Sequence, residues 1–200
     1  MSNPTLSPSL LERVSLAVAP RADARVAAVV KVVIGVALLT LLAQVRVLIG
    51  PVPITGQTLG VLLLGAAYGL PLGLISVGAY LALGAAGVPV FAGSASGLAY
   101  LAGPTGGYLL GFVLAAAVLG FLSRRGWDKG VLSCCLMMLL ASAVIYVPGV
   151  AWLKQALGLT WSAAVAAGVT PFLFGDAVKL ALATAALPGA WRLLGDGHRR

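Results

Sequence analysis

One acid and one base stand three residues apart inside the last long apolar segment of the chain. Asp176 and Lys179 belong to the stretch TPFLFGDAVK, residues 170–179, in a chain where only 9% of residues are charged. Residues three apart on a helix share a face, so both charged groups point the same way. A carboxylate accepts hydrogen bonds from N–H groups and an ammonium donates to a carbonyl. Together they suit a ligand with a urea or amide edge.

The same pair allows two other interpretations. Ionisable groups at membrane depth are costly, so each is a functional-site hypothesis, either for a ligand or for a proton or ion relay. The third possibility is an internal ion pair that only supports packing, although desolvation often offsets the attraction in such pairs. Thr55 and Gln57 are further candidates for ligand binding, because they are the only polar side chains of their loop.

The composition is that of a membrane protein. Hydrophobic residues make up 60% of the 200 residues, whereas about a quarter of the residues in a soluble protein are charged. Several apolar runs reach the roughly 20 residues that a helix needs to cross a lipid bilayer. Lipid offers no partners to the backbone, which favours helices, and polar and apolar residues do not alternate as in a barrel. We therefore expect an all-α integral membrane protein.

Several function classes lack the necessary residues. The net charge of +8 lies in the tails and one short loop, and not on one soluble face as nucleic-acid binding would need. No G-x-x-x-x-G-K-[ST] motif is present for a nucleotide. The single histidine, His198, lies in the tail, and Cys134 and Cys135 are adjacent, which leaves neither a Ser–His pair nor a metal-ligand set. We expect no cofactor, no metal and no nucleic-acid partner.

Prolines and glycines divide the apolar sequence into six expected membrane helices. Pro148-Gly149 should end the fifth helix, and the sixth should begin with Thr170 as cap and Pro171 in its first turn, and end near Leu187. Residues 58–86 should form two short helices with a tight turn at Gly69–Pro71, because an even number of crossings keeps the flanking positive clusters on one side. The six ranges are about 25–49, two within 58–86, 105–123, 130–147 and 170–187, with a short interfacial helix at about 10–19.

Positive charge predicts the orientation. Nine of the 13 Lys and Arg residues would lie on the cytoplasmic side, and Arg46 and Lys154 on the outer side. We expect residues 1–24 to form a cytoplasmic tail, 25–190 the six-helix substrate-binding domain and 191–200 a basic cytoplasmic tail. Three Pro/Gly-rich junctions, at about 50–56, 87–93 and 168–175, would then share the outer face. Irregular backbone near membrane depth is tolerated where it lines a cavity, so this face should carry a binding pocket.

Four stretches, in order along the chain, resemble one family. They are PVPITGQTL (51–59), GVPVFAG (87–93), GPTGGYLLGF (103–112) and PFLFGDAVK (171–179), and they resemble the BioY family of biotin-specific substrate-binding (S) subunits of energy-coupling factor (ECF) transporters. The resemblance implies the S-component fold with six transmembrane helices in a prokaryotic cytoplasmic membrane, and one outward-facing biotin site. It also implies that a transmembrane coupling subunit and ABC-type ATPase subunits energise uptake, and that the chain is not an enzyme.

The resemblance also implies a set of substrate-binding residues, with the acid and the base of the last helix on the ureido ring of biotin. The set comprises Asp176, Lys179, Thr55, Gln57, Ser94 and Tyr108. Ser94 stands where the family often has a second glycine, and no residue is assigned to the biotin carboxylate. An S subunit for another small vitamin, a proton-coupled carrier and a membrane enzyme are the alternatives.

Overall fold

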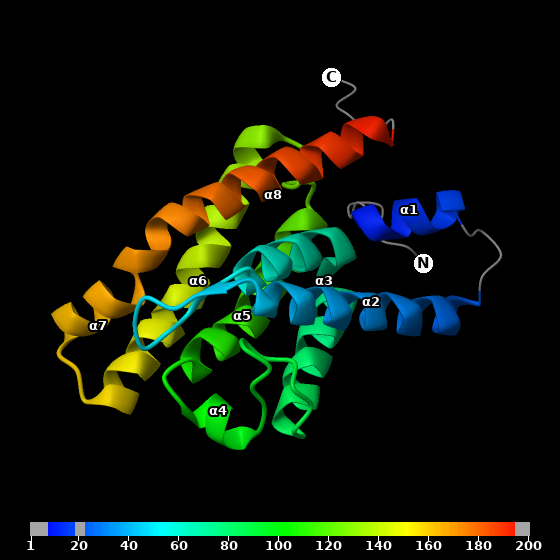
Figure 1. Cartoon of the computed structure of the whole chain (residues 1–200). Helices are drawn as coiled ribbons and strands as arrows, with labels where there is room; N and C mark the ends of the chain where they lie inside the picture. Colours follow the sequence, from blue (N-terminus) through cyan, green and yellow to red (C-terminus); the bar gives the residue numbers. More distant parts are fainter. Residues whose placement is uncertain (1–7, 19–22, 195–200) are drawn as a thin grey trace.

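The apolar runs of the sequence fold into helices that pack side by side, with one small β-hairpin (Figure 1). The computed structural model describes residues 8–18 and 23–194. Among these, five helical stretches are long and apolar enough to cross a membrane, which agrees with the expected all-α membrane class. The elements are α1 (Leu10–Val18), α2 (Ala24–Gln44), β1 (Arg46–Val47), β2 (Ile54–Thr55), α3 (Gln57–Ala85), α4 (Leu98–Ala102), α5 (Gly106–Ser123), α6 (Val131–Leu157), α7 (Trp161–Gly168), the 3₁₀ turn η1 (Thr170–Phe172) and α8 (Leu173–Leu193).

The helix α3 folds back on itself at Gly69. Gly69 has φ 74° and ψ 177°, a conformation that glycine adopts without steric cost. A Cβ added to Gly73 would lie 3.4 Å from the Cα of Gly65, whereas eight residues of a straight helix span about 12 Å. Two short helical segments therefore meet at the predicted turn. Together they make up α3, which is one of the five stretches long enough to cross a membrane. The count of six membrane crossings stays a prediction.

The first long helix ends earlier than predicted. Helix α2 stops at Gln44, and not near Ile49, because the following residues pair with the start of the next segment. Arg46 pairs with Thr55 and Val47 pairs with Ile54 in an antiparallel ladder. The predicted irregular junction is thus the turn of a β-hairpin that brings the end of α2 close to the start of α3.

Two helices continue through a proline, beyond the residues at which the fifth and sixth helices were predicted to end. Helix α6 continues through Pro148 to Leu157, and α8 continues through Pro188 to Leu193. A proline removes one backbone donor, and packing can offset that loss. At the first site, a Cβ on Gly149 would lie 2.5 Å from the Tyr108 ring, so the glycine lets α5 and α6 approach closely. Beyond the second site, the fully buried Trp191 anchors the last turns of α8.

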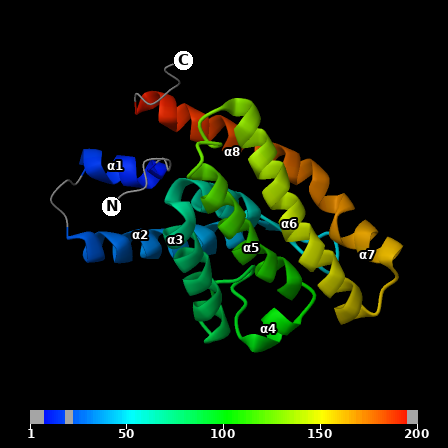
Figure 2. The ribbon, with the colours of Figure 1, turned by 180° about the vertical axis from the view of Figure 1, so that it is seen from behind.

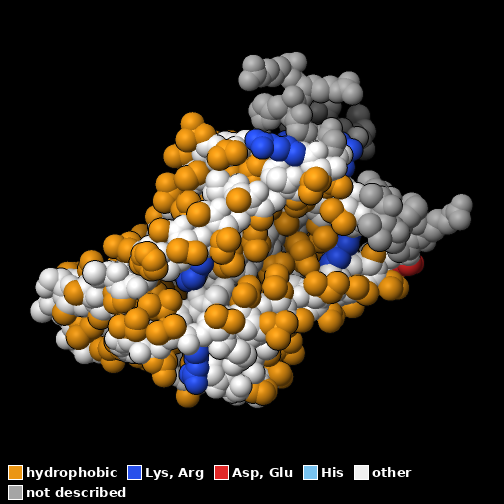
Figure 3. Space-filling view, turned by 45° about the horizontal axis from the view of Figure 1, so that its top comes forward, with side chains coloured by type: hydrophobic (Ala, Val, Ile, Leu, Met, Phe, Trp, Pro, Cys, Tyr) orange, Lys and Arg blue, Asp and Glu red, His pale blue; other side chains and the backbone are white. Residues whose placement is uncertain are grey.

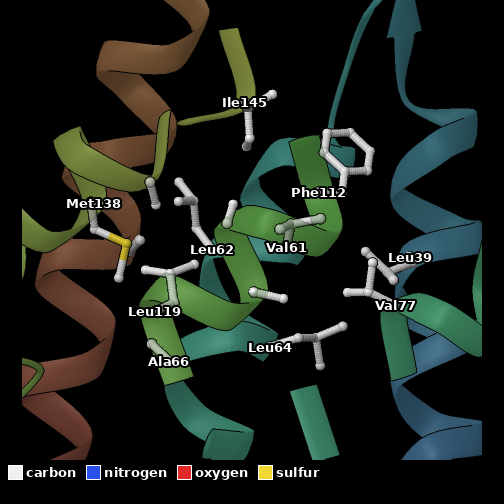
Figure 4. Packing of buried hydrophobic residues seen from close by; sticks show 14 of the residues in the cluster. Leu39, Val61, Leu62, Leu64, Ala66, Val77, Phe112, Leu119, Met138 and Ile145 are labelled. Carbon is white, nitrogen blue, oxygen red and sulfur yellow. The ribbon is translucent and has the colours of Figure 1, made fainter. Parts of the chain in front are cut away.

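Buried aliphatic residues of α2, α3, α5 and α6 form the core that holds the bundle together (Figure 4). Leu39, Val61, Val77 and Leu119 are completely buried. By contrast, the face of α2 that points away from the bundle is apolar and exposed, and Leu41 retains 68% of its accessible surface. Hydrophobic side chains cover much of the surface in Figure 3. Contiguous apolar patches of this kind mark contact with lipid or with other proteins.

The two ends of the bundle carry different elements. Helix α1, the α5–α6 turn and the end of α8 lie at one end, whereas α4 and α7 lie at the other (Figures 1 and 2). The predicted short helix at about 10–19 is confirmed as α1, with Ala19 outside the described residues. The predicted tail residues Arg21, His198, Arg199 and Arg200 also lie outside them.

Asp128, in the turn between α5 and α6, is fully buried. Its Oδ2 accepts a hydrogen bond of 2.6 Å from the indole N–H of Trp191, and no described residue bonds its Oδ1. Burial raises the pKa of the Asp128 carboxyl, while the Trp191 hydrogen bond and the charge of Lys129 oppose that rise. The folded protein therefore holds the proton of this carboxyl more tightly than the unfolded chain does.

We expect Asp128→Asn to gain stability relative to the wild type as the pH rises. The contribution of a carboxyl with a raised pKa is complete below its unfolded value of about 3.9 and is lost as the pH rises through the folded value. Asparagine keeps an acceptor for Trp191 and removes the charge. Thermal unfolding in detergent between about pH 4 and 8 should show a Tm difference that grows with pH. A difference that stays constant over this range would contradict the raised pKa.

Candidate ligand-binding site

A partly open cavity lies among the hairpin, α3, α5, α6 and α8. About 570 Å³ of space free of protein atoms lies within and in front of it, open solvent included. Its walls are mostly apolar and aromatic, with a few polar groups. The lining residues are Val52, Pro53, Thr55, Gln57, Thr58, Tyr100, Thr105, Tyr108, Leu109, Phe112, Ser142, Ile145, Tyr146, Phe172, Asp176 and Lys179.

The acid and the base of α8 face this cavity as an ion pair. The Nζ of Lys179 donates to Oδ1 of Asp176 at 2.9 Å. The side chains of Lys179 and Asp176 are only 12% and 17% exposed. The prediction that both share one helix face is therefore confirmed. Both charged groups border the cavity, so a ligand could contact each of them.

Two neighbouring helices orient the pair. The hydroxyl of Tyr146, on α6, donates to the second oxygen of Asp176. The Nζ of Lys179 also donates to Oγ1 of Thr58, on α3, at 2.9 Å. Neither Tyr146 nor Thr58 was among the predicted site residues. A usable signal for the first was its spacing from Ser142, because polar residues four apart in an apolar helix share a face.

A wall of three aromatic rings adjoins the pair. The rings of Tyr108, Tyr146 and Phe172 lie with centroids 6.2–6.4 Å apart. The Tyr108 hydroxyl donates to the backbone oxygen of Gly168 at 2.8 Å. Phe172 ends the 3₁₀ turn that precedes α8, and Val169, not the predicted Thr170, occupies the cap position of that turn. The turn thus places an aromatic side chain in the cavity where the sequence suggested an ordinary capped helix start.

Thr55 and Gln57 line the cavity next to the hairpin. The Thr55 hydroxyl donates to Oε1 of Gln57 at 2.9 Å, and Nε2 of Gln57 donates to the Tyr80 hydroxyl at 2.7 Å. That hydroxyl donates in turn to the backbone oxygen of Val90 at 3.0 Å. Both ends of the Gln57 amide are therefore engaged. The chain of bonds fixes the start of α3 to the loop that follows α3.

Ser94 is the one predicted site residue that does not line the cavity. It is exposed, with a left-handed φ of 58°, and its backbone N–H donates to Oε1 of Gln44 at 3.1 Å. The Nε2 of Gln44 donates to the backbone oxygen of Phe91 at 3.1 Å. Ser94 thus takes part in tying the loop that follows α3 to the end of α2. The structure brings together the other five predicted residues, Thr55, Gln57, Tyr108, Asp176 and Lys179.

Comparison with known proteins identifies the family of this chain. The family model described as the BioY family matches residues 14–196. The chain belongs to the BioY family. The resemblance that the four sequence stretches indicated is therefore confirmed.

Individual BioY relatives are similar along most of their length. The probable biotin transporter BioY of Pyrococcus horikoshii is 43% identical over 148 residues, which cover 74% of this chain and 86% of the relative. The biotin transporter BioY of Thermotoga maritima is 37% identical over 155 residues, or 77% and 89% of the two chains. These relatives are named as transporters and not as enzymes, in agreement with the expectation for this chain.

A solved structure shares the fold. The crystal structure of the S-component for biotin from an ECF-type ABC transporter superposes with a TM-score of 0.76 at 25% identity. The match covers 84% of this chain and 92% of that protein. The chain therefore has the architecture of an ECF S-component.

Proposed function

We propose that this chain binds biotin from outside the cell and mediates its uptake across the prokaryotic cytoplasmic membrane. The observation that carries the proposal is the Asp176–Lys179 pair, held at the wall of a partly open cavity with apolar and aromatic walls. The BioY relatives are named as biotin transporters, and the choice of biotin as the ligand rests on those names. Biotin is the cargo, and the proposal involves no cofactor.

The chemistry of the pair matches the ureido ring of biotin. The urea oxygen can accept from Nζ of Lys179, and a urea N–H can donate to the carboxylate of Asp176. Tyr146 and Thr58 hold both side chains in place before a ligand arrives, which lowers the entropy that binding costs. The apolar walls around Phe112 suit the sulfur-containing ring and the aliphatic tail of biotin.

The proposed topology has six crossings and both termini in the cytoplasm. The fold-back at Gly69 supports it, because it splits α3 into two short segments. The α5–α6 turn, with Arg124 and Arg125, lies at the same end of the bundle as Arg192 on α8. Positive charge of this kind favours the cytoplasmic side. The hairpin, α4 and α7 then face the exterior.

Separate subunits would energise the transport. The sequence holds no phosphate-binding glycine-rich motif, and the similar solved protein is a component of an ECF-type ABC transporter. We propose that a transmembrane coupling subunit and ABC-type ATPase subunits drive the release of bound biotin into the cytoplasm. Neither partner is needed for binding itself.

Ligand-dependent thermal unfolding in detergent tests the function. Biotin at 100 times its Kd should stabilise the chain by about 2.7 kcal/mol, and a vitamin without a ureido ring, such as thiamine, should give no shift. A shift with another vitamin and none with biotin would overturn the substrate assignment. Proton-dependent uptake by liposomes that contain this chain alone would instead support a carrier.

We expect Tyr146→Phe to weaken biotin binding about tenfold, because it removes one hydrogen bond to a charged group. The ring stays, so the aromatic wall and the fold should persist. Isothermal titration with biotin checks the prediction. Tyr68→Phe is the matched control, since the Tyr68 hydroxyl donates to the backbone oxygen of Lys31 at 3.1 Å and Tyr68 does not line the cavity. Equal affinities in the two variants would show that Tyr146 does not position Asp176.

A further inference from the structure

Arg46 lies on the first strand of the hairpin and is not itself one of the residues that line the cavity. It pairs directly with Thr55, and directly opposite residues of an antiparallel ladder project their side chains from the same face. Thr55 is buried and lines the cavity, whereas Arg46 is exposed. The pairing therefore sends the arginine side chain to the cavity side of the hairpin, at its solvent edge.

A glycine makes room for the guanidinium of Arg46. A Cβ added to Gly93 would lie 2.1 Å from Nη1 of Arg46, so the guanidinium occupies the space of the missing side chain. Burial raises the pKa of Tyr100, and the nearby charge of Arg46 acts in the opposite direction. Tyr100 lines the cavity. The guanidinium thus lies against Gly93, in the loop that follows α3, and near Tyr100 of the cavity wall.

The charge of Arg46 has no counter-charge in the described part of the chain. Among the described acids, Asp176 pairs with Lys179, and Asp128 is buried in the α5–α6 turn. Glu12 lies on α1 and Asp23 caps the start of α2. No ion pair joins any of these carboxylates to Arg46. The planar guanidinium of Arg46, with its five N–H donors, is therefore available to bind an anion.

We propose that Arg46 binds the carboxylate of the ligand at the cavity mouth and selects for small acids over their neutral analogues. This inference rests on the proposed function: the ureido ring lies at Asp176 and Lys179, and the carboxylate end of biotin points outward. Arginine suits this role because its guanidinium binds carboxylates through two parallel hydrogen bonds. The assignment fills the role that no residue of the sequence motifs covers.

The test compares biotin with biotinamide, in which a neutral carboxamide replaces the carboxylate. The purified wild type should bind biotin about 10- to 100-fold more tightly than biotinamide, as expected for a charge-assisted contact. Arg46→Gln should bind both ligands alike, with an affinity for biotinamide near that of the wild type. Arg46→Lys should keep part of the preference, because it retains the charge without the fork.

Lys154→Gln is the matched control. Lys154, in the last turn of α6, stacks over the ring of Trp161 at 5.3 Å and does not line the cavity. Its substitution removes the same unit charge and should leave the preference of the wild type intact. Raising the salt concentration should reduce the preference of the wild type and of this control, because exposed charges are screened.

The outcomes separate this inference from the proposed function. If the wild type binds biotin and Arg46→Gln keeps the full preference over biotinamide, the inference is wrong and the proposed function stands. If Arg46→Gln weakened the binding of both ligands equally, Arg46 would stabilise the hairpin without contacting the carboxylate. That result would also overturn the inference. If the wild type binds neither ligand, the proposed function fails and the inference fails with it.

Discussion

Asp176→Asn and Lys179→Met are each expected to weaken biotin binding about 100-fold or more. Truncating one member of a hydrogen-bonded, desolvated charge pair costs about 2–5 kcal/mol in binding. Each variant also removes one of the proposed contacts to the ureido ring. Asp176 lies in the first turn of α8, but neither side chain caps the helix start. Membrane insertion should therefore persist, and equilibrium binding measures the loss.

Lys31→Met provides the control for a lysine removed from a membrane helix. Lys31 lies on α2 and does not line the cavity, so its substitution should leave biotin affinity unchanged. The double variant Asp176→Asn/Lys179→Met adds a test of coupling: its unfolding temperature should exceed that of the less stable single variant, since no charge is left unpaired. Unchanged biotin affinity in both single variants would show that the ion pair only supports packing and does not bind the ligand.

Gly111→Ala is expected to destabilise the protein by about 2–3 kcal/mol or more, as overpacked cores do. A Cβ at this position would lie 2.8 Å from both the Cα and the backbone oxygen of Ile145. These are backbone atoms of α6, so no side-chain rotation can relieve the contact. Helices α5 and α6 would have to separate, and the cavity that Ile145 and Leu109 line would change with them. Thermal unfolding without ligand measures the effect.

Gly78→Ala is the control for this substitution. Gly78 lies within α3, and no heavy atom is found within 4 Å of a Cβ added there. Alanine favours a helix over glycine by up to about 1 kcal/mol, so the control should be neutral or slightly stabilising. If Gly111→Ala unfolds at the temperature of the control, the close approach of α5 and α6 is not a determinant of stability.

The sequence predicted the features that depend on local spacing. Charges in an apolar helix identified Asp176 and Lys179, and their separation of three residues placed them on one face. The glycine and proline near residue 70, together with the positive clusters on either side of the segment, predicted the fold-back of α3. Family motifs in the outer loops indicated Thr55, Gln57 and Tyr108.

Features that depend on tertiary contacts were not predictable in this way. The spacing from Ser142 could mark Tyr146 as a candidate, but its contact with Asp176 exists only because α6 and α8 pack side by side. Pro148 was expected to break a helix, but the space left by Gly149 allows packing that offsets one lost hydrogen bond. Ser94 lies in a left-handed turn that directs it to Gln44 and away from the cavity. The hairpin strands, at two residues each, are too short to show alternation.

Equilibrium binding of radiolabelled biotin to the purified chain tests the central claim most directly. We expect saturable binding at a single site in the wild type, which unlabelled biotin displaces and which Asp176→Asn loses. Such a result needs neither a coupling subunit nor an ATPase. Folded wild-type protein that shows no saturable biotin binding, or equal binding in Asp176→Asn, would contradict the assignment of this cavity as a biotin site.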